Sequence, residues 1–324
     1  MTSHDLVWDH GEATVLSTAA MLAECRFDLP AGPFRPFAKA PWMGTIDDPA
    51  IIGHLRELGG DFVCVPMGAG GHTGPMPADW QDLPNSPAAL PIHGPAGDAE
   101  WTITNAGPAA ITLALDYAEP SPVRRLERTI AVRRDAPALD LTLTIHARRQ
   151  SAISVGLHPI LRLPETLGRL ELAAEFGFGL VHPTQAVSAR DQEFARLSAV
   201  VQAAGTLDLS HVPLPLANLN VQLCGMRGPL TATYLDEGCG VVLDWDRTLL
   251  PSLQIWHTDR GIAGKPWNNL YRGLGLEPIA AAFDLNDAVS TGPNPINRRG
   301  VPTAIAIHPA LPTVIGYSVA AFSS

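Results

Sequence analysis

Lysine is nearly absent from this sequence, which has only Lys39 and Lys265 among 324 residues. Asp and Glu outnumber Lys and Arg by 32 to 22, so the formal net charge is -10. A surface of this sign repels the phosphates of nucleic acids and of anionic membranes, which argues against both as partners. A group of arginines between Arg124 and Arg149 is the exception, and we interpret these arginines as solvent-facing positions on strands.

Cysteine and long apolar runs are also scarce. Four widely spaced cysteines form no CxxC pair, which excludes the usual zinc-ribbon and thiol-redox motifs and indicates free buried thiols. No apolar run approaches the roughly 18 residues of a membrane-spanning helix, and the N-terminus lacks a signal-peptide pattern. We therefore expect a soluble, cytoplasmic protein with no membrane partner.

Several common catalytic motifs are missing as well. The sequence has no GxSxG, HExxH or GxxxxGK[ST] pattern, so serine-hydrolase, zincin and P-loop chemistry lack their signals. The glycine-rich segment 68–74 is followed by Pro75 and Pro77, which predicts a surface loop and not a phosphate-binding turn before a helix. The 11 histidines include no HxH pair, so no metal site is predicted, although one built from dispersed ligands is left open.

Short strands are the dominant pattern. Apolar and polar residues alternate over 139–146, and similar runs occur at 101–104, 111–115, 230–234, 240–243, 252–256, 303–307 and 314–319. Turn formers separate these runs, since the chain has 29 Gly and 30 Pro. With 46% hydrophobic residues available for a core, the sequence predicts one all-β domain over residues 1–324, a large antiparallel sandwich.

Only two helices are predicted. Asp48 before Pro49 is typical of a capped helix start, so a helix is expected over 49–58. Charged residues interrupt apolar ones at helical spacing over 187–204, where a second helix is expected. Neither is followed by a parallel-strand pattern, which disfavours a doubly wound fold.

Three titratable side chains lie at the ends of predicted strands. His93 precedes Gly94 and His158 precedes Pro159, and each histidine taken alone is equally well a structural residue of a loop or core. Glu277 lies between Leu276 and Pro278, where a carboxylate is costly to bury unless it is hydrogen-bonded or functional. A carboxylate with two imidazoles indicates proton transfer on a neutral substrate.

The ordered set of segments resembles the aldose 1-epimerase (galactose mutarotase-like) family. His93-Gly94 with Trp101 is similar to the segment that supplies the first active-site histidine of the family, and residues 155–159 are similar to the strand end that bears the second. Residues 253–257 resemble the strand that lines the sugar pocket, and residues 275–278 resemble the segment with the catalytic glutamate.

This resemblance implies the galactose mutarotase-like supersandwich and an isomerase that interconverts the α and β anomers of a hexose without a cofactor. Glu277 would be the base on the anomeric hydroxyl, His158 the acid toward the ring oxygen, and His93 would hold that oxygen. Work at neutral pH would require a nearby carboxylate to hold up the pKa of His158. The sugar-binding residues expected from the resemblance are Trp42, His72, Asn218, Trp256 and Arg272.

Two departures from the family keep other interpretations open. Residues 67–70 contain no arginine, and Asn218 or Asn220 stands where many members have an aspartate. The alternative is a non-catalytic carbohydrate-binding protein on the same fold. A third interpretation, an isomerase or lyase acting on an acidic sugar, draws on Arg272. The partner expected in each case is a small-molecule sugar, bound by a monomer or a homodimer.

Overall fold

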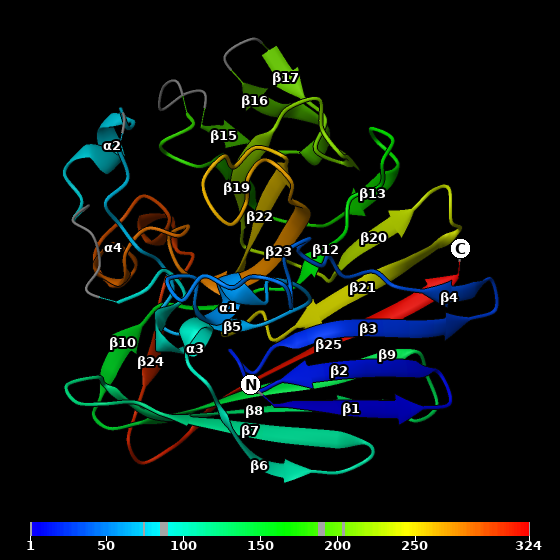
Figure 1. The fold of residues 1–324 in the computed structure, drawn as a ribbon. Helices are drawn as coiled ribbons and strands as arrows, with labels where there is room; N and C mark the ends of the chain where they lie inside the picture. Colours follow the sequence, from blue (N-terminus) through cyan, green and yellow to red (C-terminus); the bar gives the residue numbers. More distant parts are fainter. Residues whose placement is uncertain (1, 74, 85–89, 187–191, 203–204, 324) are drawn as a thin grey trace.

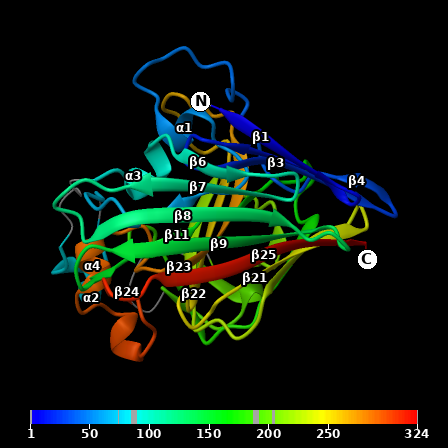
Figure 2. The ribbon, with the colours of Figure 1, turned by 90° about the horizontal axis from the view of Figure 1, so that it is seen from below.

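Two large antiparallel sheets dominate the structure (Figure 1). The computed structural model describes residues 2–73, 75–84, 90–186, 192–202 and 205–323. Within these residues, one sheet has eight strands and the other has nine, and their strand pairs are antiparallel. Figure 2 shows β7, β8, β9 and β25 of the nine-stranded sheet side by side.

The eight-stranded sheet contains, in spatial order, β15 (Glu193–Phe194), β14 (Phe178–Val181), β19 (Asn218–Cys224), β22 (Ser252–Asp259), β23 (Arg272–Ala280), β11 (Val155–Leu157) and β5 (Val63–Cys64), with β12 (Ile160–Leu161) also on β23. The nine-stranded sheet contains β18 (His211–Val212), β13 (Leu170–Ala173), β20 (Leu230–Tyr234), β21 (Cys239–Trp245), β25 (Thr313–Ser323), β9 (Ala138–Ala147), β8 (Val123–Val132), β7 (Ala110–Asp116) and β6 (Thr102–Ala106).

The smaller elements lie around these sheets. A four-stranded sheet contains β1 (Ser3–Trp8), β2 (Gly11–Leu16), β3 (Leu22–Leu29) and β4 (Gly32–Phe34). Two further sheets have two strands each: β10 (Ser151–Ile153) pairs with β24 (Ile305–Ile307), and β16 (Val200–Gln202) pairs with β17 (Gly205–Leu207). The described helices are α1 (Gly53–Arg56), α2 (Ala78–Gln81), α3 (Gly94–Asp98) and α4 (Asp287–Thr291), with the 3₁₀ turns η1 (Leu197–Ala199) and η2 (Asn297–Arg299).

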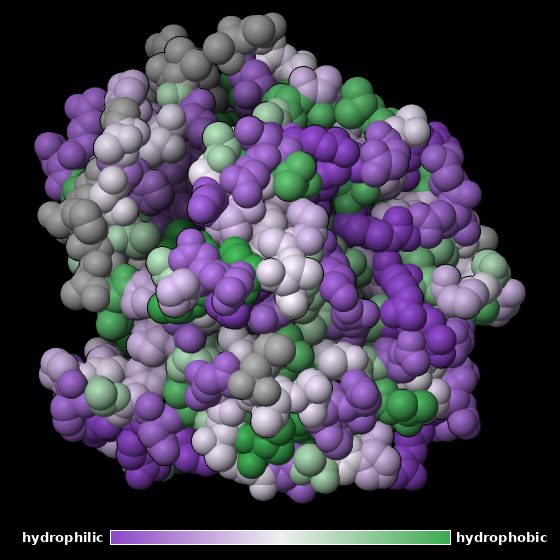
Figure 3. Space-filling model, viewed as in Figure 1, coloured by the Kyte–Doolittle hydropathy of each residue, from purple (hydrophilic) through white to green (hydrophobic). Residues whose placement is uncertain are grey.

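The main core lies between the two large sheets. On β9 the side chains of Leu139, Leu141 and Leu143 are buried at every second position, which confirms the predicted half-buried strand. Leu253 and Ile255 of β22 belong to the same buried cluster. The other predicted strands are also present. On the face of the molecule in Figure 3, hydrophilic residues predominate and hydrophobic ones are scattered among them.

The opposite face of the eight-stranded sheet carries a second apolar cluster. Phe62, Cys64, Tyr271 and Ile279 are buried there, and Trp256 packs against them. Because side chains alternate along a strand, residues 254, 256 and 258 of β22 share this face, while 253 and 255 point into the main core. All but the first residue of β23 are buried, since this strand is covered on both faces.

Both helix predictions are wrong for the described residues. The first helix is only α1, because the Asp48 carboxylate accepts a hydrogen bond from the Ala50 N–H (3.0 Å) and forms a turn there instead of a helix cap. In the second segment, residues 192–202 form β15, η1 and β16. Its remaining residues, 187–191 and 203–204, lie outside the described part of the chain.

The interpretation of the arginine group as solvent-facing is wrong at Arg128, whose side chain is 0% exposed. Arg128 Nη2 donates to Asp61 Oδ2 (2.5 Å) and contacts the Tyr317 hydroxyl (2.6 Å), and Nη1 donates to the carbonyl of Ala20 (2.6 Å). The Tyr317 hydroxyl also donates to Asp61 Oδ2 (2.7 Å). This network joins β8 and β25 of the nine-stranded sheet to the segment that enters β5.

All four cysteines are free and buried, as the sequence predicts. Among the described residues, no helix is long and apolar enough to cross a membrane.

Arg128→Met should lower the free energy of unfolding by about 3–5 kcal/mol, because it leaves the Asp61 carboxylate buried without its cation. Urea denaturation followed by circular dichroism measures this change. The matched control is Arg133→Met, which removes an exposed ion pair with Asp140 and should cost about 0–1 kcal/mol. Equal losses of unfolding free energy in the two variants would show that the buried network stabilises the fold no more than an exposed ion pair does.

Candidate active site

A cavity of about 330 Å³ opens on the second face of the eight-stranded sheet. Its apolar wall includes the rings of Phe62, Trp256 and Trp267. Its polar lining residues are His54, His93, His158, Asn220, Gln254, Glu277 and Asp284. These side chains come from loops and strands that are far apart in the chain, so only the tertiary fold brings them together.

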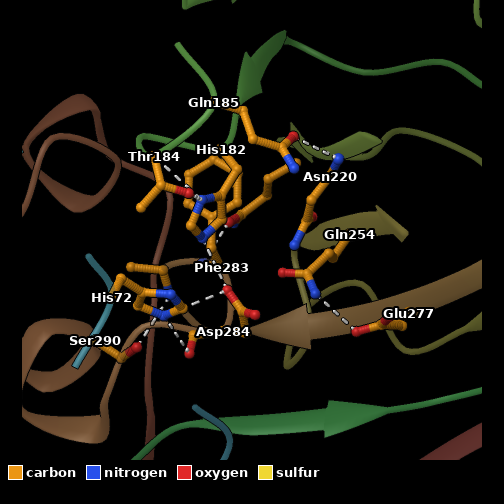
Figure 4. Close-up of polar contacts among 12 residues, drawn as sticks. His72, His182, Thr184, Gln185, Asn220, Gln254, Glu277, Phe283, Asp284 and Ser290 are labelled. Carbon is orange, nitrogen blue, oxygen red and sulfur yellow. Dashed lines mark hydrogen bonds and ion pairs between the residues drawn. The ribbon is translucent and has the colours of Figure 1, made fainter. Parts of the chain in front are cut away.

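The Glu277 carboxyl is placed by the pairing of β22 with β23. Gln254 lies opposite Glu277 in this ladder, and its Nε2 donates to Glu277 Oε2 at 3.0 Å (Figure 4). Glu277 Oε1 lies over Gly275, where a Cβ atom would come within 2.6 Å of this oxygen. A glycine at position 275 therefore makes room for the carboxyl group.

The imidazole of His158 lies next to this carboxyl group. Its Nε2 lies 3.4 Å from Glu277 Oε1, and both side chains are almost fully buried. The His158 ring stacks on Phe62, with centroids 4.5 Å apart and planes at 17°. The backbone N–H of His158 donates to the Phe62 carbonyl at 2.8 Å, so strand pairing and ring stacking together fix the imidazole.

His93 completes the group predicted from the sequence. Its ring stands edge-on to that of His158, with centroids 5.0 Å apart. His93 Nδ1 lies 3.1 Å from Cys64 Sγ, and burial raises the pKa of the Cys64 thiol well above its usual value. A protonated thiol can donate to the lone pair of Nδ1, and in that tautomer His93 carries its proton on Nε2 and offers it as a donor. Gly94 follows with φ +64, where a Cβ would meet the Val65 carbonyl at 2.0 Å.

Burial controls the charges of these groups. It raises the pKa of Glu277 well above its usual value, the charge of Asp284 raises it further, and the hydrogen bond from Gln254 opposes the shift. Burial also lowers the pKa of His158 to about 3, with a further contribution from His54, and lowers the pKa of His93 well below its usual value. The pKa of His158 is thus lowered and not held up by a carboxylate as expected, because desolvation outweighs the attraction of Asp284.

Both shifts favour the uncharged forms of the pair, a protonated carboxyl group on Glu277 and a neutral imidazole on His158. Three polar atoms of the lining, Asn220 Oδ1, Gln254 Oε1 and His158 Nδ1, are buried and have no hydrogen-bond partner among the described residues. Buried polar atoms of this kind are rare in proteins and call for a partner from outside the chain.

The aromatic wall explains the positions of the two predicted tryptophans. Trp256 lines the cavity and stacks on Tyr271 behind it, with planes at 17°. Trp42 is not among the lining residues. It packs edge-on against Trp267, and its Nε1 donates to the carbonyl of Leu55 at 2.8 Å. Trp42 thus supports the wall from outside.

Asn218 and Arg272 do not line the cavity. Asn218 lies at the start of β19, where its side chain accepts from Thr258 Oγ1 (2.7 Å) and donates to the Gly261 carbonyl (3.0 Å). Asn220, two residues further along the same face, lines the cavity in its place. Arg272 is an odd number of residues from Glu277, so it projects from the opposite face of β23, where Nε donates to Asp259 Oδ1 (2.9 Å).

His72 also lies outside the lining, but it contacts a residue that belongs to it. Its Nε2 is 3.9 Å from Oδ1 of Asp284. His54, His182 and Asp284 were not among the predicted site residues. His54 Nδ1 lies 3.0 Å from Asp98 Oδ1, which orients its ring at the cavity. The alternation of β22 and β19 signals Gln254 and Asn220, but no local pattern signals His54 or His182.

Comparisons with known proteins identify solved structures that share this architecture. No family model and no curated protein matches the sequence. Among solved structures, a putative aldose 1-epimerase from Escherichia coli has a TM-score of 0.68 and 16% identity, covering 100% of this chain and 99% of its own. An aldose epimerase homologue from C. elegans has a TM-score of 0.66 and 14% identity, with 99% of both chains covered.

A galactose mutarotase-like protein from Lactobacillus casei has a TM-score of 0.60 and 13% identity, covering 99% of this chain and 100% of its own. Identities this low establish the fold and leave the activity to be argued from the site. Over its whole length, this chain has the β-sandwich fold of the aldose 1-epimerase and galactose mutarotase-like proteins.

Proposed function

We propose that this protein is an aldose 1-epimerase that interconverts the α and β anomers of a neutral monosaccharide. The observation that carries this proposal is the Glu277–His158 pair, with Nε2 and Oε1 3.4 Å apart inside a cavity of about 330 Å³. A proton donor and a proton acceptor fixed side by side are what ring opening and ring closure require. The solved structures of similar fold named as epimerases and mutarotases support the same assignment.

The reaction moves one proton out of the sugar and one proton in. Glu277 passes its proton to His158 and then takes the proton of the anomeric hydroxyl, while His158 donates to the ring oxygen. The C1–O5 bond breaks, the aldehyde rotates, and the ring closes on its other face with the proton movements reversed. The Nε2–H of His93 holds the ring oxygen and stabilises the negative charge that develops there. Each proton transfer contributes on the order of 10²–10⁴ in rate.

The lining also indicates the class of sugar. Trp256 and Trp267 offer the aromatic faces on which a sugar ring packs, and the unpaired acceptors of Asn220 and Gln254 suit hydroxyl groups. No lysine or arginine lines the cavity within the described residues. A carboxylate or phosphate on the substrate would therefore lack a cation, and a neutral sugar is favoured over an acidic or phosphorylated one.

The pKa shifts that favour the uncharged forms of the pair support a second candidate, a protein that binds a sugar without converting it. A protonated Glu277 and an uncharged His158 can form hydrogen bonds to a sugar without transferring a proton to it. Saturable binding of a hexose together with anomer exchange no faster than in buffer would select this candidate.

Glu277→Gln should slow anomer exchange of glucose and galactose by about 10²–10⁴-fold, because the amide keeps the shape and the hydrogen bond to Gln254 but cannot take a proton. Polarimetry of freshly dissolved sugar, or NMR exchange spectroscopy, measures the rate. Glu171→Gln, at an exposed position of β13, is the matched control and should leave the rate unchanged. An unimpaired Glu277→Gln variant would refute the mechanism.

The enzymatic rate should stay level as the pH falls from ~6.5, the pKa of an ordinary histidine, to about 4. The active pair carries one proton. A second proton binds His158 only near its lowered pKa of about 3, and the single proton leaves only above the raised pKa of Glu277. Initial rates from about pH 4 upward, corrected for the buffer reaction, test this. A bell centred on two ordinary pKa values would contradict it.

A further inference from the structure

Two imidazoles and a carboxylate meet at one edge of the cavity, outside the pair that carries the proposed proton transfers (Figure 4). One ligand atom each from His72, His182 and Asp284 lies within 4.8 Å of the others. His182 Nε2 is 2.9 Å from Asp284 Oδ1, and His72 Nε2 is 3.9 Å from the same oxygen. The two imidazole rings are 5.2 Å apart at 60°.

The three residues follow three different strands. His72 lies in the loop after β5, His182 comes directly after β14, and Asp284 lies in the turn after β23. The Ala69 N–H, three residues before His72, donates to the Asp284 carbonyl (3.0 Å), and the His182 N–H donates to the Asn220 carbonyl of β19 (2.9 Å). The group is thus held in place by the scaffold.

The position of Asp284 is constrained by the residue that precedes it. The preceding residue, Phe283, has φ +54, a conformation that is costly for a bulky side chain. It is held there because its N–H donates to Gln222 Oε1 at 2.8 Å. The Phe283 ring also packs edge-on against His182, with centroids 5.0 Å apart. Strain of this kind persists where the surrounding structure enforces it, commonly at functional sites.

The ring of His182 is fixed through its other nitrogen, Nδ1. Its Nδ1 lies 2.8 Å from Thr184 Oγ1, so a hydroxyl group orients the ring and leaves Nε2 directed at Asp284. His182 Nδ1 also accepts a hydrogen bond from the Thr184 backbone N–H (3.3 Å), so the ring proton lies on Nε2 beside Asp284, and an ion at this site would take its place.

We propose that His72, His182 and Asp284 form a binding site for a divalent transition-metal ion such as Zn²⁺ or Co²⁺. Two imidazoles and one carboxylate are ligands that such ions accept, with bonds of about 2.0–2.2 Å. Closing the group to these distances requires a shift mainly of His72, whose side chain is partly exposed in a loop. Three protein ligands leave further coordination positions open.

The proposed metal site lies at the edge of the cavity. Asp284 is a lining residue, so an ion at this site would lie beside the cavity, where it could accept hydroxyl oxygens of a bound molecule. The positive charge would also offset the charge that Asp284 exerts on Glu277. The binding of the ion itself does not depend on the proposed anomer exchange, so either proposal can fail without the other.

The test is a titration of the chelator-treated full-length protein with Co²⁺ alone, followed by visible absorption, and with Zn²⁺ by calorimetry. We expect one equivalent to bind. His72→Ala and Asp284→Asn should each weaken binding by about 100-fold or more, since losing a ligand costs at least as much as losing an outer partner. His72→Ala preserves the buried residues, so its result does not depend on the folding of the Asp284 variant.

The matched control is His211→Ala, because His211 Nδ1 lies 3.2 Å from Asp208 Oδ2 in an exposed pair of the same chemistry. This variant should bind the ion as the wild type does. Loss of binding in the control, equal binding by wild type and His72→Ala, or no saturable binding of either ion up to about 1 mM would each overturn the proposal. Circular dichroism of each variant verifies that the fold is retained.

Discussion

The buried network of Arg128, Asp61 and Tyr317 is the interaction on which the cavity depends. It links the two large sheets, and Asp61 immediately precedes Phe62, whose ring stacks on His158 and stands edge-on to His93. Displacing a buried ion pair leaves charges without partners, which is costly. The position of Phe62, and with it the two imidazoles, is therefore set from the interior of the sandwich, by residues that do not line the cavity.

Desolvation is the second determinant of this site. The same burial that raises the pKa of Glu277 lowers those of His158 and His93, so it favours the uncharged forms of all three groups. A bound sugar would bring hydroxyl groups into this dry space and give the ionised form of the pair hydrogen-bond partners. Charge separation would then occur where fixed dipoles can stabilise it.

Much of the fold could be predicted from the sequence, because strand alternation is a local property. Glu277 and His158 were identifiable because a titratable group in an apolar run is conspicuous. Arg128 shows where such reasoning stops, since its partner Asp61 is 67 residues away and nothing near either residue signals the pairing. The helix expected over 49–58 failed for a local reason, since the Asp48 side chain stabilises a turn equally well.

The sheet order also has a consequence for how the molecule forms. β23, which carries Glu277, lies between β22, its neighbour in sequence, and β11, where Val155 pairs with Ala280. Strands that are far apart in the chain pair slowly, because closing the long loop between them costs conformational entropy before the contacts form. During synthesis, the cavity can be complete only after Asp284, one of its lining residues, has emerged from the ribosome.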